Sequence, residues 1–254
     1  MTLEAFFRAH RRGAVAFSGG ADSAFLLWAA KKQGCEVRAY YGDTCFQPAF
    51  AKENAIDLAA QMGVPLEIVP LDVLSLEKVA ENSENRCYFC KKALFSALWQ
   101  SAQADGFEIL LDGNNASDSA SDRPGMRALE ELGVLSPLRL CGLTKAEIRR
   151  QSKAAGLPTW NLPAYACLAT RIPTGTKIMA KALLNIDRGE AMLREAGFSD
   201  FRLRLRPWGG LLQLPKAQFP LWKEKGPTLS AALSPLFPKI VLDETPRNQE
   251  AMPL

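Results

Sequence analysis

The chain has 254 residues, of which 48% are hydrophobic and 23% are charged, a balance typical of globular proteins and unlike that of fibrous or disordered ones. Its formal net charge of +4 suits nucleotide phosphates but is too small to argue for nucleic-acid binding. The start, MTLEAFFRAHRRGAVAF, lacks the apolar core of a signal peptide, and no stretch approaches the roughly 20 apolar residues of a membrane span. We therefore expect a cytoplasmic protein with no membrane partner.

Six cysteines and a single histidine, His10, limit the chemistry further. Cytoplasmic cysteines stay reduced, so these are expected to be packing residues, metal ligands or reagents rather than disulfides. One histidine, placed before the first predicted strand, disfavours histidine-based catalysis and histidine-ligated zinc.

Strands and helices are predicted to alternate through the first seventy residues. Residues 2–12 are predicted to form a short amphipathic helix. After it, apolar runs typical of buried parallel strands alternate with segments whose apolar residues have helical spacing. The pattern predicts a strand over 13–17, a helix to residue 33, a strand over Cys35–Tyr41, a helix over 48–62 and a strand over Leu66–Val69. This order predicts an α/β fold with a doubly wound parallel sheet, whose ligand site lies at the carboxyl ends of the strands.

The rest of the chain is expected to complete this domain and add a smaller one. The first group of elements is a helix within 82–99, a strand over Glu108–Leu111, a candidate fifth strand over Leu138–Leu140 and a helix over Thr144–Ala155. After a glycine- and proline-rich segment, 156–178, come a helix over Ile178–Ala196, a strand over Asp200–Arg206, a strand over Leu211–Leu214, a helix around 216–225 and a strand over Lys239–Leu242. We expect a nucleotide-binding domain over 1–175 and a small α+β domain over 176–254.

The segment SGGADS, Ser18–Ser23, joins the first strand to the first long helix. Backbone N–H groups and a helix dipole converge at such a turn and form an anion site, while Gly19 and Gly20 let the chain approach a ligand closely. Asp22 is placed to cap the helix or to hold Mg²⁺ beside a phosphate. A plain strand-to-helix turn with a capping aspartate is the alternative.

No lysine follows these glycines, so the loop is not the G-K-[ST] loop of ATPases and GTPases. It resembles the PP-loop, SGGxDS, of the ATP pyrophosphatases, which have the adenine nucleotide alpha-hydrolase fold. The resemblance implies that a substrate oxygen attacks the α-phosphorus of ATP and that pyrophosphate leaves. It also implies that the loop binds ATP and Mg²⁺ through Ser18, Gly19, Gly20, Asp22 and Ser23.

Cys87 and Cys90 form a C-x-x-C motif within NRCYFCKK, and Cys167 lies far along the chain within YACLATRIP. Basic neighbours on both sides of the motif favour accessible thiols of lowered pKa, and the alternative is two small buried residues at a helix start. Three thiolates are one short of a closed zinc site but would leave one iron of a 4Fe–4S cluster open. The other cysteines, Cys35, Cys45 and Cys141, are expected to be packing residues. Cys45 follows a strand end and could also lie near the expected site.

Further motifs follow one another in a fixed order: RCYFCK, DGNNASD, DRPGMRALEELGVLSPL, GLTKAEIR, LPTWNLPAYACLATRIPTG and the RLR of Arg204–Arg206. Together they resemble the LarE family, ATP-dependent sulfur transferases that mature the nickel-pincer nucleotide of lactate racemase, over about residues 13–210. The resemblance implies a PP-loop ATP pyrophosphatase domain with a small C-terminal domain. The implied reaction adenylylates a carboxylate of pyridinium biscarboxylate mononucleotide and replaces an oxygen with sulfur.

The resemblance also implies roles for single residues. Cys167 is the candidate sulfur carrier, and the catalytic set comprises Cys167, Cys87, Cys90 and Asp22. Gly113 would lie beside the nucleotide. The anionic nucleotide substrate would be bound by Arg171, Arg204, Arg206 and Glu190. A sulfide or persulfide donor and a homo-oligomer are the further expected partners.

The sulfur source is left open. One branch of the family sacrifices the sulfur of the cysteine matching Cys167, and the other holds a 4Fe–4S cluster on three cysteines, which the presence of Cys87 and Cys90 favours. Rival functions are a tRNA thiolase of the PP-loop class, which the small net charge disfavours, and an ammonia-dependent ligase, which has no use for the three cysteines. A nucleotide-binding regulatory module is the non-enzymatic alternative.

The chain departs from the family pattern at three positions. Trp208 stands where the family has histidine, Pro215 replaces an acidic residue, and Asn114 replaces a threonine. These differences permit another substrate on the same thiolation machinery.

Overall fold

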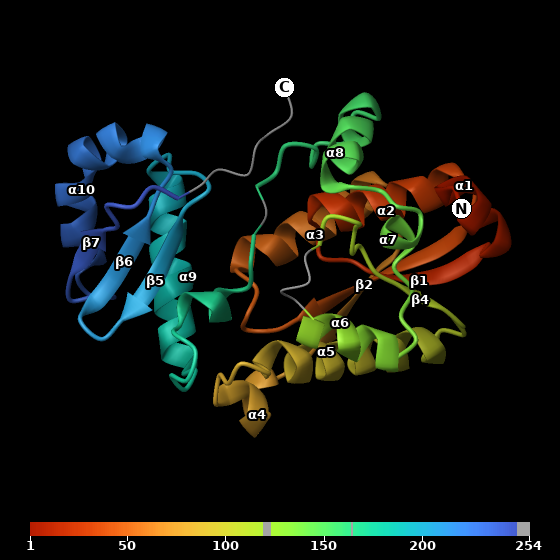
Figure 1. Ribbon diagram of the computed structural model, residues 1–254, viewed down its shortest axis with the longest axis horizontal. Coiled ribbons are helices and arrows are strands. Elements are labelled where there is room, and N and C mark those ends of the chain that lie inside the picture. Colours follow the sequence, from red (N-terminus) through yellow and green to blue (C-terminus); the bar gives the residue numbers. More distant parts are fainter. Residues whose placement is uncertain (119–122, 164, 248–254) are drawn as a thin grey trace.

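The computed structural model describes residues 1–118, 123–163 and 165–247, so Asp122 and Ala164 of the motifs above lie outside the described residues. The molecule is elongated and has two lobes (Figure 1). The larger lobe begins at the N-terminus, and the smaller one holds the later strands and helices.

The larger lobe is built on a parallel sheet. Within the described residues its strands are β1 (Arg12–Ala16), β2 (Glu36–Asp43), β3 (Leu66–Pro70) and β4 (Leu110–Leu111), in the order β3-β2-β1-β4. The chain therefore reverses its winding at β1, between β2 on one side and β4 on the other. The predicted α/β class and doubly wound sheet are confirmed.

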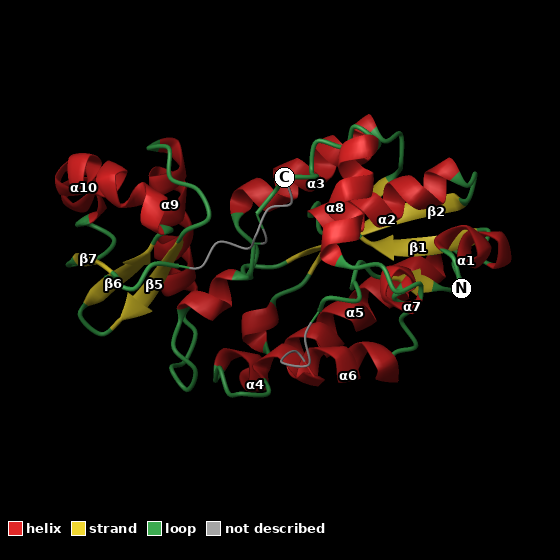
Figure 2. Ribbon diagram, turned by 45° about the horizontal axis from the view of Figure 1, so that its top comes forward, coloured by secondary structure: helices red, strands yellow, loops and turns green. Residues whose placement is uncertain are grey.

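Helices cover both faces of this sheet (Figure 2). The helices of the lobe are α1 (Leu3–Ala9), α2 (Ala21–Lys32), α3 (Ala49–Gln61), α4 (Glu77–Ala80), α5 (Arg86–Ala104), α6 (Arg123–Glu131), α7 (Pro137–Leu140) and α8 (Lys145–Ala154). Successive residues of β1 face opposite sides: Val15 packs in one core with Phe25 of α2 and Ile148 of α8, whereas Ala14 packs in another with Leu98 of α5. The small residues of β1 are thus explained by burial on both faces.

The predicted fifth strand over Leu138–Leu140 is wrong. Pro137 begins the helix α7 there, because proline has a helix-compatible φ and no N–H to give to a sheet. The edge contact is made three residues earlier, by a single bridge between Leu135 and Leu111.

The smaller lobe packs two helices on a second sheet. Its elements are α9 (Ala180–Glu195), β5 (Arg202–Arg206), β6 (Gly209–Gln213), α10 (Phe219–Leu233) and β7 (Ile240–Leu242). β5 and β6 are antiparallel, and β6 and β7 are parallel. A Cβ at Gly189 of α9 would lie 2.7 Å from Leu203, so this glycine lets the helix approach the sheet closely.

One apolar cluster contains residues of both lobes. Phe46, Val73 and Val79 of the larger lobe are buried in the same cluster as the residues beneath α9 and β5. Backbone hydrogen bonds cross at the same place, from Leu168 to the Phe46 carbonyl at 2.8 Å and from Ile178 to the Ala80 carbonyl at 2.7 Å. We call this region the seam; the predicted domain division at residue 175 stays a prediction.

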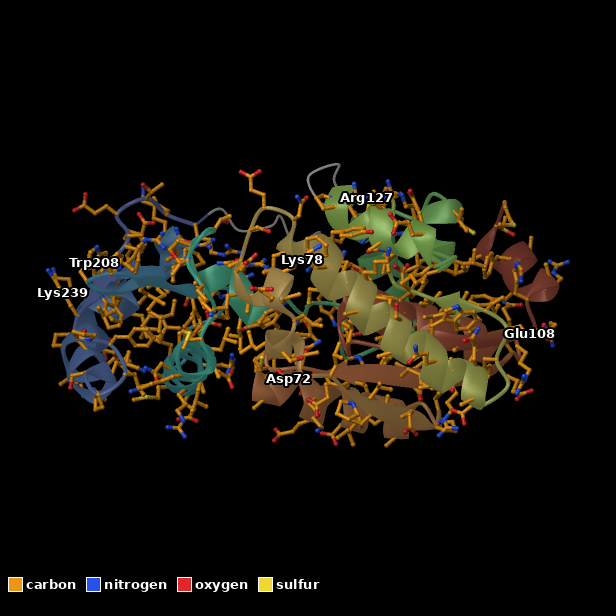
Figure 3. All side chains as sticks on the ribbon, turned by 90° about the horizontal axis from the view of Figure 1, so that it is seen from below. Asp72, Lys78, Glu108, Arg127, Trp208 and Lys239 are labelled. Carbon is orange, nitrogen blue, oxygen red and sulfur yellow. The ribbon has the colours of Figure 1, made fainter. Side chains whose placement is uncertain are left out.

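The departure from the family pattern at Trp208 lies far from the seam. Figure 3 shows Trp208 and Lys239 at the outer end of the smaller lobe, whereas Asp72 and Lys78 lie toward the middle of the molecule. Trp208 is 44% exposed. Among the described helices, none is long and apolar enough to cross a bilayer.

Candidate nucleotide and thiol site

The predicted PP-loop follows β1 and leads into α2. Gly19 has φ +71°, and a Cβ there would lie 3.0 Å from the Ala55 backbone of α3, so glycine is required on both counts. Gly20 precedes α2 and has no side chain to cap it, so the first-turn N–H groups are the donors that this turn would offer to an anion. The Ser18 and Ser23 hydroxyls lie 3.1 Å apart and close the loop.

Gly113, in the loop after β4, contacts the first turn of α2. A Cβ at Gly113 would lie 2.9 Å from the Ser23 backbone nitrogen, closer than real Cβ contacts allow. The loop that begins at Asp112 is therefore brought against the PP-loop, as expected at the point where a doubly wound sheet reverses.

Asp22, the acidic residue of this loop, has a strongly shifted pKa. Its Oδ1 is buried with no hydrogen-bond partner among the described residues. Burial first, and then the negative charge of Asp118, raise the pKa of Asp22 to about 6. An unpaired carboxylate oxygen with a second carboxylate nearby fits the oxygen ligands that Mg²⁺ prefers, so Asp22 and Asp118 are the residues that would hold it.

Asp112 and Asn114 hold the shape of the adjoining loop. The Asn114 side-chain amide donates to Asp112 Oδ2, and its backbone N–H donates to Asp112 Oδ1 at 3.2 Å. Burial raises the pKa of Asp112 to about 6. The asparagine found in place of the family's threonine therefore makes a local contact that stabilises the loop.

The three predicted site cysteines lie near one another at the seam. Cys87 and Cys90 are in the first turns of α5, and Cys167 precedes the short 3₁₀ turn Leu168–Arg171. Cys87 and Cys167 each raise the pKa of Cys90, although 77 residues separate Cys90 from Cys167 along the chain. Within the described residues, however, no three cysteine, histidine or acidic side chains are close enough to hold a metal ion as they stand.

The prediction of a lowered thiol pKa in the C-x-x-C motif is wrong for Cys90. Burial, and then the other thiols, raise the pKa of Cys90 to about 12. The pKa of Cys167 is also raised, because burial outweighs the opposing effects of Arg86 and Arg171. Both are neutral thiols near pH 7.

Arg86 connects the C-x-x-C helix to the turn that bears Cys167. Its guanidinium donates to Asn82 Oδ1 at 2.5 Å, to the Ala169 carbonyl at 3.2 Å and to Cys87 Sγ at 3.5 Å. Arg86 lowers the pKa of both Cys90 and Cys167. From the sequence, Arg86 was interpreted only as a basic neighbour of the motif, and its contact with the Cys167 turn was missed. Its position immediately before Cys87 was the signal that could have indicated a role at the thiols.

Cys45 is a fourth thiol near this group. It follows β2, is exposed, and raises the pKa of Cys90. Cys45 therefore lies near the site, as its position after a strand end indicated. Cys35 is instead buried in the core, where its thiol donates to the Phe7 carbonyl at 3.5 Å.

Arg171 and Glu190, predicted to bind substrate, form a buried ion pair. Their side chains are 1% and 0% exposed, and Arg171 Nε lies 2.8 Å from Glu190 Oε1. Glu190 also accepts from the Tyr165 hydroxyl and from the Leu203 backbone N–H at 3.0 Å. These contacts position the Cys167 turn against α9 and β5, and the substrate-binding role predicted for the two residues stays a prediction.

The β5 arginines place surplus positive charge beside this pair. Arg204 donates to the Thr170 carbonyl at 2.8 Å, and Arg206 is only partly buried. Burial and then Arg171 lower the pKa of Arg202 to about 10, and burial also lowers that of Arg204. Arg202 was missed from the sequence because nothing in the pattern shows that it is buried. Clustered guanidiniums of this kind suit an anionic ligand.

Comparison with known proteins gives the family. No family model matches the chain. The chain is 30% identical over 223 residues to pyridinium-3,5-bisthiocarboxylic acid mononucleotide synthase of Lactiplantibacillus plantarum. The aligned region covers 85% of this chain and 79% of that protein. The chain belongs to the LarE family.

Two other relatives extend this result. An uncharacterised Synechocystis protein is 34% identical to this LarE-family chain over 220 residues, covering 85% of it and 81% of the relative. The tRNA-specific 2-thiouridylase MnmA of a Thermotoga strain is 28% identical over 185 residues, covering 56% of this chain and 52% of MnmA. The LarE-family member described here is therefore a PP-loop protein related to sulfur transferases.

Asp22 provides a test of the LarE-family nucleotide site. Its folded pKa lies above the unfolded value, so its ionisation costs folded-state stability as the pH rises toward and through about 6. We expect Asp22→Asn to raise the free energy of unfolding at neutral pH by about 1–3 kcal/mol and to abolish Mg²⁺-dependent nucleotide binding. Urea unfolding and calorimetry measure the two effects. A stability gain that does not grow between about pH 4 and about pH 7.5 would contradict this account.

Glu190 tests the positioning role. Glu190→Gln leaves the Arg171 guanidinium buried without a counter-charge and should destabilise the protein by about 3–5 kcal/mol. Glu195→Gln, an exposed change on the same helix, should alter stability by less than about 0.5 kcal/mol. Urea unfolding compares them, and equal effects would remove the ion pair from the account of the fold.

Proposed function

We propose that the protein is an ATP-dependent sulfur transferase that converts a carboxylate of pyridinium biscarboxylate mononucleotide into a thiocarboxylate. The observation that carries this proposal is that two sets of residues follow neighbouring strands: the PP-loop after β1, and Cys45 and Phe46, which meet the Cys167 turn, after β2. The name of the L. plantarum relative, a bisthiocarboxylic acid mononucleotide synthase, supports the same acceptor.

The first half of the proposed reaction activates the acceptor. A carboxylate oxygen attacks the α-phosphorus of ATP, the bond to the bridging oxygen breaks, and pyrophosphate leaves with the electron pair. The first turn of α2 would bind the departing phosphates through its N–H groups. Asp22 and Asp118 would hold Mg²⁺, which supplies charge neutralisation to the phosphates. The product, an acyl-adenylate, has AMP as its next leaving group.

The second half delivers sulfur. A sulfide sulfur forms the bond to the carbonyl carbon, the bond to the AMP oxygen breaks, and AMP departs with the original carboxylate oxygen. Cys87, Cys90 and Cys167 would hold a 4Fe–4S cluster, whose open iron would carry the sulfide. The donor set fits such a group, since these buried thiols repel one another as thiolates and require a cation among them to ionise together. The side chains would have to move closer to bind it.

Arg204 and Arg206 would bind the anionic groups of the acceptor. They lie on one face of β5, and Arg204 also contacts the turn that bears Cys167. An acceptor phosphate or second carboxylate placed there would reduce the repulsion among these arginines.

A tRNA acceptor is the second candidate, because MnmA is similar to 56% of this chain. The net charge of +4 supplies little of the electrostatic attraction on which RNA binding depends. Sulfur incorporation into tRNA, with none into the mononucleotide, would decide for this candidate.

The sulfur source is tested by single cysteine variants purified without oxygen. We expect iron and acid-labile sulfide in the wild type, and the loss of both, with loss of sulfur transfer, in Cys87→Ala, Cys90→Ala and Cys167→Ala. Because activation uses other residues, all three variants should keep carboxylate-dependent pyrophosphate release. Cys141→Ala, which alters a thiol outside the group, is the matched control and should keep both activities.

Mass spectrometry of the wild type after turnover separates the two sulfur routes. An intact Cys167 thiol is expected. Iron-free protein that still transfers sulfur, with the mass of about one H₂S lost from Cys167, would overturn the cluster and establish sacrifice of this cysteine.

A further inference from the structure

The turn that follows β2 carries an exposed thiol that the proposed function does not use, Cys45. Three hydrogen bonds hold the backbone of this turn, residues 44–47. The Gln47 N–H donates to the Thr44 carbonyl at 3.1 Å, the Thr44 N–H donates to Gln47 Oε1 at 3.1 Å, and the Phe46 N–H donates to Thr44 Oγ1 at 3.2 Å. Phe46 is buried in the core of the seam, so the turn is fixed there while the Cys45 side chain stays at the surface.

Hydrogen bonds join this turn to the two segments that carry the other site cysteines. The residue after Cys45, Phe46, accepts a 2.8 Å bond from the N–H of the residue after Cys167, Leu168. Arg86, at the start of α5, donates at 3.2 Å to a carbonyl of the same 3₁₀ turn. Three segments that are distant along the chain are therefore held together at the point where each of them carries cysteine.

The thiols of these segments form one group of four. Cys90 lies close enough to the other three for each of them to act on it electrostatically: Cys167, Cys87 and Cys45. Cys45 is exposed, whereas the other members are partly buried. A 4Fe–4S cluster takes four thiolates when all of its irons have protein ligands, and three thiolates leave one iron open. The protein thus has one thiol more at this place than the proposed function requires.

We propose that Cys45 is an exchangeable fourth ligand: in the resting protein its thiolate binds the iron that Cys87, Cys90 and Cys167 leave open, and it gives up this position to sulfide. The inference rests on the proposed function, because it presupposes the cluster. As with the other three side chains, Cys45 would have to move closer to bind.

The exchange involves no gain or loss of electrons. The sulfur of hydrosulfide forms the bond to iron, the bond from iron to Cys45 Sγ breaks, and the Cys45 thiolate takes the proton of the hydrosulfide. Exposure makes Cys45 the member of the group suited to this, because a side chain that leaves the metal at the surface is solvated by water, whereas a buried one would lose its partner without replacement. While bound, Cys45 would keep water and other small ligands from the open iron.

Cyanide binding to the full-length protein, purified without oxygen and then reduced, tests this inference by electron paramagnetic resonance and needs no sulfur transfer. Cyanide competes with Cys45 for the fourth iron, so its apparent affinity falls with the fraction of molecules in which that iron is open. We expect Cys45→Ala to keep the iron and acid-labile sulfide of the wild type and to bind cyanide more tightly by about 10-fold or more. Cys45→Ser, whose hydroxyl is a weaker ligand of iron, should lie between the two. Cys141→Ala, which alters a thiol outside the group, should match the wild type.

The outcomes separate this inference from the proposed function. Equal cyanide affinities in the wild type and in Cys45→Ala, with iron in both, would overturn the role of Cys45 and leave the three-cysteine cluster standing. Loss of iron from Cys45→Ala would also overturn it, since an exchangeable ligand is not required to hold the cluster. Because Cys45 is exposed, its truncation should leave the urea midpoint unchanged, which separates loss of a ligand from a disturbed fold. A wild-type protein without iron would overturn the cluster itself, and this inference with it.

Discussion

The buried ion pair between Arg171 and Glu190 is the interaction on which the arrangement of the seam depends. Removing two charges from water is costly, and the cost is met here by a 2.8 Å contact together with hydrogen bonds from Tyr165 and from the backbone of Leu203. Those partners belong to the turn around Cys167, to α9 and to β5. One carboxylate thus fixes three segments relative to one another, and the thiol of Cys167 is held where α5 presents its own two.

The two lobes hold charge clusters of opposite sign, acidic around the PP-loop and basic along β5. Around the PP-loop the acids Asp22 and Asp118 lie in a buried setting that raises the pKa of Asp22, so that site is completed by cations. Along β5 the guanidiniums lie close enough to lower the pKa of Arg202 and Arg204, so that site is completed by an anion. Both perturbations cost folding free energy. Binding Mg²⁺ with a nucleotide at one site and an anionic acceptor at the other would recover it.

The parts of the molecule that the sequence predicts are those set by local pattern. The alternation of strands and helices and the glycines of the PP-loop depend on neighbours within a few residues, and both agree with the structure. One failure is local, and the others concern distant packing. Leu138–Leu140 has an alternating pattern, but Pro137 places it in a helix. Burial of Cys90 by residues from elsewhere reverses the direction expected for its pKa. The approach of Lys145 to Asp22, 123 positions earlier in the chain, depends on how α8 packs.

The seam also explains why the outer end of the smaller lobe can depart from the family pattern. An acyl-adenylate hydrolyses if water reaches it, so under the proposed function it must be formed and consumed in one place. The loops that would carry out the two halves follow β1 and β2, strands that lie about 4.8 Å apart in the sheet. Phe46, Val73 and Val79 join the core of the smaller lobe and fix the Cys167 turn against these loops. The tryptophan at 208 lies in the turn between β5 and β6, at the outer end of the smaller lobe, and leaves this contact untouched.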